Sequence, residues 1–107
     1  MIVRALGLLV LAATSAHAGA SFDCSKAATP VEQAICADPA LADLDGKVAA
    51  AYTSALQKLA ADPKRRAELA AAQRRFIAQR NSAFGQPGFS LSGHLSQRLA
   101  QLQAAIP

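Results

Sequence analysis

The sequence predicts an all-α protein: a small helical hairpin or bundle of about four helices with one disulfide, preceded by a cleavable signal peptide. Two observations predict this fold class. Alanine is abundant, and no segment alternates apolar and polar residues in the manner of a half-buried strand. A residue able to cap a helix stands before proline at Thr29-Pro30, Asp38-Pro39 and Asp62-Pro63, and each of these pairs predicts a helix start.

Residues 1–20 are expected to form the signal peptide, and residues 21–107 a single domain. The first segment holds one arginine, an apolar stretch, and then small residues that fit a small-x-small cleavage site. Its apolar stretch is shorter than the roughly 20 residues that a membrane span needs. The residues just before Cys24 do not form a lipobox. We therefore expect a periplasmic or secreted protein that keeps no stable membrane anchor after signal cleavage.

The two cysteines, Cys24 and Cys36, are expected to form a disulfide. An exported protein meets an oxidising compartment, and two cysteines allow only one intramolecular pairing. The alternatives are two free thiols or a metal site. A metal site would need further ligands, and His94 is the only histidine after residue 20. No metal or cofactor is therefore expected, and His94 itself is expected at the surface.

The helices can be placed from their caps and their apolar spacing. A Thr29-x-x-Glu32 capping box opens the first helix, which should reach Cys36. The others are expected over about Pro39–Ala61, Pro63–Ser82 and Ser92–Ala105, with a loop over Phe84–Ser90 before the last. In the last helix, apolar residues recur at helical spacing: Leu95, Leu99, Leu102 and Ile106.

The second helix has an apolar face with an acid at its edge. At about 100° per residue, one side carries Leu41, Leu44, Val48, Ala51, Tyr52, Ala55 and Leu59. Asp45 falls at the rim of this side, and Gly46 is expected to point outward. In the third helix the buried stripe is expected to contain Leu69, Ala70, Phe76 and Ile77, with Gln73 and Arg80 at its centre. Arg80 then needs a partner, because an unpaired guanidinium is costly to bury.

The tight Asp62-Pro63 connection predicts that partner. Two helices joined there should run antiparallel, so that the numbers of facing residues add up to about 125. Asp45 then lies opposite Arg80, and Tyr52 lies opposite Gln73. We interpret these four residues as a structural polar seam that fixes the register of the hairpin. The alternative is a binding or catalytic centre, but the set lacks a nucleophile–base pair, and no residue is assigned a catalytic role.

Basic residues along the third helix are candidate partner-binding residues: Lys64, Arg65, Arg66, Arg74 and Arg75. The full sequence has a formal net charge of +4, and Arg4 is the only charged residue among residues 1–20. The residues after position 20 therefore carry a net charge of +3. A mild positive charge favours an anionic partner or polymer but identifies neither. The alternative is a basic face that is merely solvated. Nucleic acid is not an expected partner of an exported protein.

A set of residues spread over most of residues 21–107 follows a known pattern, and its most specific part is the segment "ICADPALADLD". The set is Cys24, Ile35-Cys36, Asp38-Pro39-Ala40-Leu41, Leu44-Asp45, Tyr52, Gln73, Phe76-Ile77, Arg80 and Arg98-Leu99. This pattern resembles the LprI-like lysozyme-inhibitor family of secreted bacterial proteins. Phe76-Ile77 stands where the family has Trp-Leu. Many members carry a second cysteine pair, where this chain has Ala83 or Phe84 and Ser90, so the loop between them is expected to be looser.

The resemblance implies an exported protein-binding module of the lysozyme-inhibitor type, and not an enzyme. Its partner would be a protein, such as a lysozyme. Two alternatives belong to other functional classes. One is a non-inhibitory periplasmic module that binds exposed apolar segments, as a chaperone does. The other is a cationic protein that docks on an anionic polymer of the cell envelope.

Overall fold

The computed structural model describes residues 19–104, which form one 3-10 turn and a set of α-helices: η2 (Cys24–Lys26), α1 (Pro30–Ala37), α2 (Pro39–Lys58), α3 (Pro63–Ala83) and α4 (Leu91–Ala104). No strand occurs in this range, so the predicted all-α class is confirmed. None of the helices within residues 19–104 has the length and apolarity needed to cross a bilayer. Residues 1–18 of the expected signal peptide lie outside the described residues. Ile106, expected on the apolar face of the last helix, lies outside them too.

The first helix begins at the predicted capping box. The N–H of Glu32 donates to Thr29 Oγ1 at 3.2 Å, and the N–H of Thr29 donates to Glu32 Oε1 at 3.2 Å. The N–H of Ala28 donates to the same carboxylate oxygen at 3.0 Å. These backbone donors, Ala28 first, hold the pKa of Glu32 below its usual value because they stabilise the ionised form.

The two Asp-Pro steps also begin helices as predicted. Asp38 Oδ1 accepts from the N–H of Ala40 at 2.9 Å, and Asp62 Oδ1 accepts from the N–H of Arg65 at 3.1 Å. Helix α2 ends at Lys58, three residues before the predicted end. The chain turns there because the N–H of Asp62 donates to the carbonyl of Leu59 at 2.9 Å.

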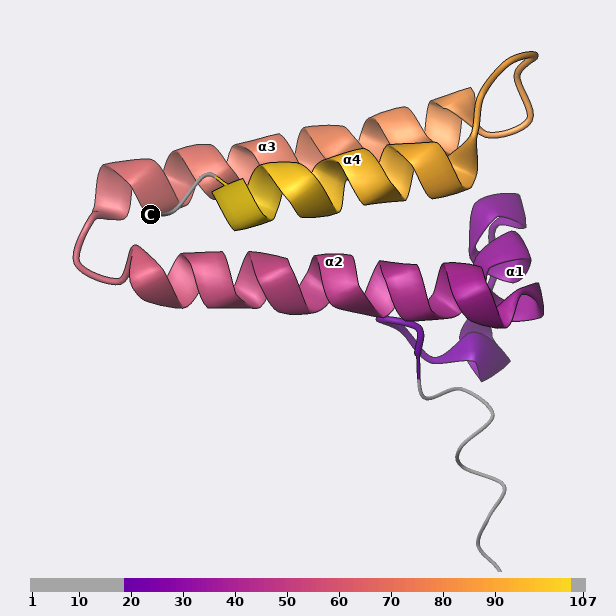
Figure 1. Ribbon diagram of the computed structural model, residues 1–107, viewed down its shortest axis with the longest axis horizontal. Coiled ribbons are helices and arrows are strands. Elements are labelled where there is room, and N and C mark those ends of the chain that lie inside the picture. The colour runs from indigo at the N-terminus through magenta and orange to yellow at the C-terminus, as the bar shows by residue number, and fades with distance from the viewer. Residues whose placement is uncertain (1–18, 105–107) are drawn as a thin grey trace, which may run out of the picture.

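The two long helices, α2 and α3, run antiparallel and are joined by the short turn at Asp62-Pro63 (Figure 1). Helix α4 returns alongside α3, and α1 lies across the open end of the hairpin (Figure 1). The most extensive helix–helix packing is between α2 and α4, whereas α2 and α3 meet directly at fewer places. Helix α4 is therefore an integral layer of the core and does not merely cover one side of a finished hairpin.

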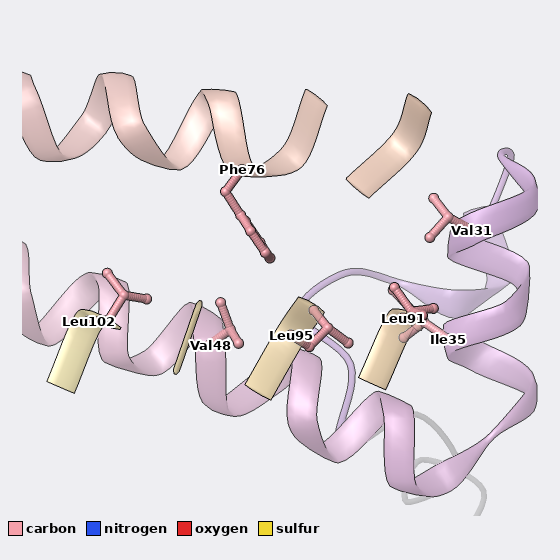
Figure 2. Packing of buried hydrophobic residues seen from close by; sticks show 7 residues of the cluster. All are labelled: Val31, Ile35, Val48, Phe76, Leu91, Leu95 and Leu102. Atoms are coloured by element: carbon pink, nitrogen blue, oxygen red, sulfur yellow. The ribbon is translucent and has the colours of Figure 1, made fainter. Parts of the chain in front are cut away.

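The core is a small apolar cluster drawn from all four helices: Val31, Ile35, Val48, Phe76, Leu91, Leu95 and Leu102. Figure 2 shows Phe76 reaching from α3 toward the side chains of α2 and α4, while Val31 and Ile35 approach from α1. Ile35 and Leu95 are fully buried. Burial of such side chains stabilises by about 1.5–3 kcal/mol each, so a core of this size leaves only a modest margin.

The expectation that Ile77 is buried was wrong, because its side chain is 40% exposed. The buried line of α3 runs through Gln73, Phe76 and Arg80. Ile77 lies about 60° around the helix from Arg80, which takes it away from α4 and toward solvent. Leu69 and Ala70 are half-buried. Only Phe76 in this helix therefore contributes a fully covered apolar side chain to the core.

The segment before η2 crosses α2 at Gly46. A Cβ built at Gly46 would collide with the carbonyl oxygen of Gly19, so only glycine permits this close approach in the chain that still carries residues 1–20. Ala20 and Phe22, which follow Gly19, pack against the core cluster. Gly46 does not point into open solvent as expected, because the N-terminal segment covers it.

The predicted disulfide between Cys24 and Cys36 is present, with the two Cα atoms 5.8 Å apart. It joins η2 to the last turn of α1, and the two buried residues of α1, Val31 and Ile35, lie within the segment that it closes. Since α1 has only 8 residues, it is too short to be stable alone in water. The disulfide and the capping box together hold this helix in place.

Reducing the disulfide should lower the thermal midpoint of unfolding by on the order of 10 °C, because the unfolded chain regains the entropy of an open loop. Circular dichroism melts with and without a thiol reductant measure this. The control is the double variant Cys24→Ser with Cys36→Ser, which should melt at the lower temperature and ignore the reductant. An unchanged midpoint on reduction would contradict a stabilising role for the bond.

Candidate functional site

Asp45 is an acid inside the protein, with only 5% of its surface exposed. Its Oδ2 accepts a hydrogen bond of 2.7 Å from the backbone N–H of Ser21. Its Oδ1 lies 3.9 Å from Arg80 Nη1, which makes the ion pair that the hairpin register predicted. The shorter contact, to the N-terminal segment, was not predicted. One carboxylate therefore connects α2 both to α3 and to the chain before η2.

Arg80 is 8% exposed, donates hydrogen bonds to one residue and forms an ion pair with another. Its Nε and Nη2 donate to Asn81 Oδ1 at 3.1 and 3.0 Å, and its Nη1 faces Asp45. The amide of Asn81 carries no charge, so Asp45 is the ion-pair partner of the buried guanidinium, and the Glu32 carboxylate acts on it from farther away. This is the arrangement that a tolerated buried arginine requires.

Gln73 is buried, but its hydrogen-bond partner differs from the expected one. Its Oε1 accepts from Arg98 Nε on α4 at 2.9 Å, and no hydrogen bond joins it to Tyr52. Tyr52 is half-buried, and its hydroxyl lies near enough to Arg98 to act electrostatically on that guanidinium. The polar seam therefore consists of two sets of contacts, Asp45 with Arg80 and Gln73 with Arg98, and the second set ties α3 to α4.

Arg98 joins the polar seam through its bond to Gln73, a role that the sequence analysis did not give it. Its Nη1 donates to Gln101 Oε1 at 3.3 Å, and its guanidinium carbon lies 5.7 Å from the centre of the Phe76 ring. Its Nη2 is buried without an acceptor among residues 19–104. Burial lowers the pKa of Arg98 below its usual value; Tyr52 acts in the opposite direction, and the like charge of Arg75 adds to the lowering.

The five candidate partner-binding residues differ in whether their side chains already have a partner within the protein. Lys64 pairs with Glu68 at 2.7 Å, one helical turn away, and both side chains are exposed. Arg66 is half-buried, and its Nη1 donates to the carbonyl of Leu56 at 2.8 Å, which fastens the start of α3 to the end of α2. Three of the five are exposed and also lack a side-chain hydrogen bond or ion pair within residues 19–104: Arg65, Arg74 and Arg75.

A cleft between α3 and α4, of about 230 Å³, was not predicted. Its lining includes Arg75 and Gln79 from α3 and His94, Gln97, Arg98 and Gln101 from α4. His94 is not the free surface residue that was expected: its ring stacks on Phe76 with centroids 4.7 Å apart and planes 11° apart. The spacing of residues 94, 97, 98 and 101 was the available signal, because it places them on one face of a helix.

The α3–α4 connection, residues 84–90, projects beyond the ends of both helices (Figure 1). Two backbone hydrogen bonds shape it, from Gln86 N–H to the Ala83 carbonyl and from Phe89 N–H to the Gln86 carbonyl, at 2.9 and 3.1 Å. Gly85 and Gly88 adopt positive φ angles of 87° and 82°, which favour glycine. The loop therefore contains a defined turn, and whether it is looser than in relatives with a second cysteine pair stays a prediction.

Residues 19–104 contain no group of three or more His, Cys, Asp or Glu side chains that could hold a metal ion. What they do contain is a disulfide-stapled helical bundle with a charged interior, a basic α3 and a projecting loop. These features define a small helical domain held together by one disulfide and buried polar contacts.

Comparison with known proteins identifies the family. The family model described as "Lysozyme inhibitor LprI" matches residues 24–105, and the chain belongs to this family. It is 36% identical over 96 residues to the protein named Lipoprotein LprI in Mycobacterium tuberculosis (strain ATCC 25618 / H37Rv), and equally to that of Mycobacterium bovis (strain ATCC BAA-935 / AF2122/97). The match covers 88% of this chain and 46% of each relative, so the chain spans about half the length of the curated relatives it matches. No solved structure matches.

The substitution Asp45→Ala should lower the free energy of unfolding by about 3 kcal/mol, because it removes the ion-pair partner of the buried Arg80 guanidinium. Urea unfolding followed by circular dichroism measures this loss. Asp43→Ala is the matched control: Asp43 lies on the same helix and pairs with Lys47 at 3.1 Å, but both side chains are more than half exposed. Its loss should stay below about 0.5 kcal/mol. An equally small loss for Asp45→Ala would mean that Arg80 reaches solvent.

Proposed function

We propose that this chain is an exported, non-catalytic module that binds and inhibits a lysozyme in the periplasm or outside the cell. The observation that carries the proposal is the family match, which spans the whole of the helical bundle from Cys24 onward. The relatives named Lipoprotein LprI support a location in the cell envelope. The apolar and small-residue pattern expected of a signal peptide supports export of this chain as well.

Inhibition of a lysozyme has a simple physical requirement. Most glycoside hydrolases act with two carboxylates set across the scissile bond, which lie in a groove open to the polymeric substrate. An inhibitor needs only to fill that groove and exclude the substrate. A convex, narrow and structured element suits this purpose, because little conformational entropy is lost when it is bound.

The 84–90 loop is the element of this protein with that shape. Gln86 and Pro87 at its tip are exposed, while Phe84 and Phe89 at its base pack against the core. The base thus anchors the tip to the bundle. The basic face of α3 is less suited to the role, because Lys64 and Arg66 already have partners within the protein.

The charge of the protein predicts how such a complex would respond to salt. A net charge of +3 gives no electrostatic steering toward a cationic lysozyme. Added salt should therefore leave inhibition unchanged or strengthen it slightly. Attraction to an anionic envelope polymer through Arg65, Arg74 and Arg75 would instead weaken as salt rises.

The direct test is lysozyme turnover on bacterial cell walls with rising concentrations of the purified protein. We expect loss of turnover at micromolar protein for at least one lysozyme class, without weakening at higher salt. The double variant Gln86→Ala with Pro87→Ala should need about tenfold more protein for the same inhibition, because it changes the tip alone. The control is Thr53→Ala with Ser54→Ala, an exposed pair on α2, which should inhibit like the parent.

Unchanged turnover across several lysozyme classes would refute the proposed inhibition. Inhibition that survives the loop variant unaltered would refute the role of the loop and leave the inhibition itself standing.

A further inference from the structure

The charged side chains that line the cleft between α3 and α4 are all cationic. Its lining holds two guanidinium groups, Arg75 and Arg98, and three carboxamides, from Gln79, Gln97 and Gln101. No aspartate or glutamate is among its lining residues. A cleft whose charged residues are all cationic attracts an anion, and low-dielectric walls increase that attraction.

The charge of Arg98 is not balanced within the described part of the protein. Its hydrogen-bond partners, Gln73 and Gln101, are both neutral amides, and Nη2 has no acceptor among residues 19–104. The other buried arginine, Arg80, has Asp45 as its anion. A half-buried guanidinium without an anion costs free energy, and an anion in the cleft would reduce that cost through its charge, although the buried Nη2 is itself closed to a ligand. The lowered pKa of Arg98 has the same physical origin, burial first and the like charge of Arg75 in addition.

The shape of the lining groups narrows the class of anion. A planar guanidinium matches a carboxylate through two parallel N–H donors. Each carboxamide presents a donor and an acceptor side by side, which suits hydroxyl groups that act as both. The apolar contribution is small, because one face of the Phe76 ring stacks on His94 and Arg98 lies near the ring as well. The ligand that fits is therefore polar and carries both a carboxylate and hydroxyl groups.

Size limits the ligand further. The cleft, at about 230 Å³, is smaller than the roughly 300–1,000 Å³ of sites for drug-sized ligands. It accommodates one sugar residue and not a longer stretch of polymer. A protruding acidic side chain of a protein would balance the charge of Arg75 and Arg98 but would leave the carboxamides of Gln79 and Gln97 without hydroxyl partners.

We propose that the α3–α4 cleft binds a single carboxylate-bearing sugar, with the exposed Arg75 binding the carboxylate, the charge of Arg98 adding to the attraction, and the glutamines binding the hydroxyl groups. This site is separate from the 84–90 loop and does not depend on lysozyme inhibition. Such a sugar could be a lactyl-ether amino sugar or a uronic acid, which share the carboxylate and differ in where it is attached.

The test is a titration of the isotope-labelled protein followed by NMR, including the arginine Nε–H signals. The probes are two matched pairs: N-acetylmuramic acid with N-acetylglucosamine, and glucuronic acid with glucose. We expect saturable shifts at Arg75, Arg98 and Gln97 with at least one acid, and binding at least about tenfold weaker for its neutral partner. The pair that responds identifies the source of the carboxylate.

Arg75→Gln tests the site in the protein, because Arg75 is exposed and its loss should not disturb the fold. It should weaken binding of the acidic sugar by about tenfold. The matched control is Arg74→Gln, the neighbouring exposed arginine, which does not line the cleft and should bind like the parent.

Three results would overturn the proposal. The first is the absence of saturable shifts with either acid. The second is equal affinity for an acid and its neutral partner, or equal loss in the two arginine variants, which would indicate diffuse charge attraction. The third is binding of an acidic peptide in preference to both sugars, which would assign the cleft to a protein partner. None of these results bears on lysozyme turnover, so the two proposals fail independently.

Discussion

The architecture depends on one buried carboxylate. Asp45 accepts from Ser21 and faces Arg80, so a single side chain holds the N-terminal segment, α2 and α3 in one arrangement. A buried charge tolerates few geometries, because moving either partner away exposes an uncompensated ion to a low-dielectric interior. In a core of only a few aliphatic side chains and one phenylalanine, apolar packing alone would leave the register of the helices less defined.

Helix α3 shows why polar contacts are needed. It contributes one well-buried apolar side chain, Phe76, whereas the other buried positions on its inner face are Gln73 and Arg80. Gln73 is held by Arg98 from α4, and Arg80 is held by Asp45 from α2. Each neighbour of α3 thus meets it through a directional contact. Since hydrogen bonds and ion pairs require specific distances and angles, they specify the position of α3 more sharply than alanine contacts could.

Much of the fold could be predicted from the sequence, because its signals are local. The capping box at Thr29 and the two Asp-Pro steps define helix starts through contacts within four residues. The disulfide followed from there being only two cysteines, and the Asp45–Arg80 pair followed from a short turn and the constant rise of a helix.

The features that were missed depend on how the helices are placed around one another. Ile77 is exposed because α4 packs on the other side of α3, and helical periodicity alone does not say which side will be covered. Gln73 bonds Arg98 and not Tyr52 because α4 packs so extensively against α2 that it reaches the seam. The crossing of the N-terminal segment over Gly46, and the α3–α4 cleft, are likewise tertiary features with only weak local signals.

The family relationship and the structure address different questions. Membership in the LprI family rests on residues 24–105, and most of the residues quoted for the resemblance are buried or half-buried. Those positions maintain the bundle. The exposed loop and the cleft, where partners would bind, lie outside that set except for Arg98 and Phe76. Such a scaffold can therefore keep its fold while the choice of partner changes.

The coupling between Asp45 and Arg80 can be measured most directly by a double-mutant cycle of urea unfolding. The variants are Asp45→Ala, Arg80→Met and the two combined. If the carboxylate compensates the buried guanidinium, the combined variant should be more stable than the sum of the single losses predicts, by about 1.5 kcal/mol or more. Losses that add to within about 0.5 kcal/mol would mean that the two groups do not depend on each other, and that this ion pair does not hold the helices in register.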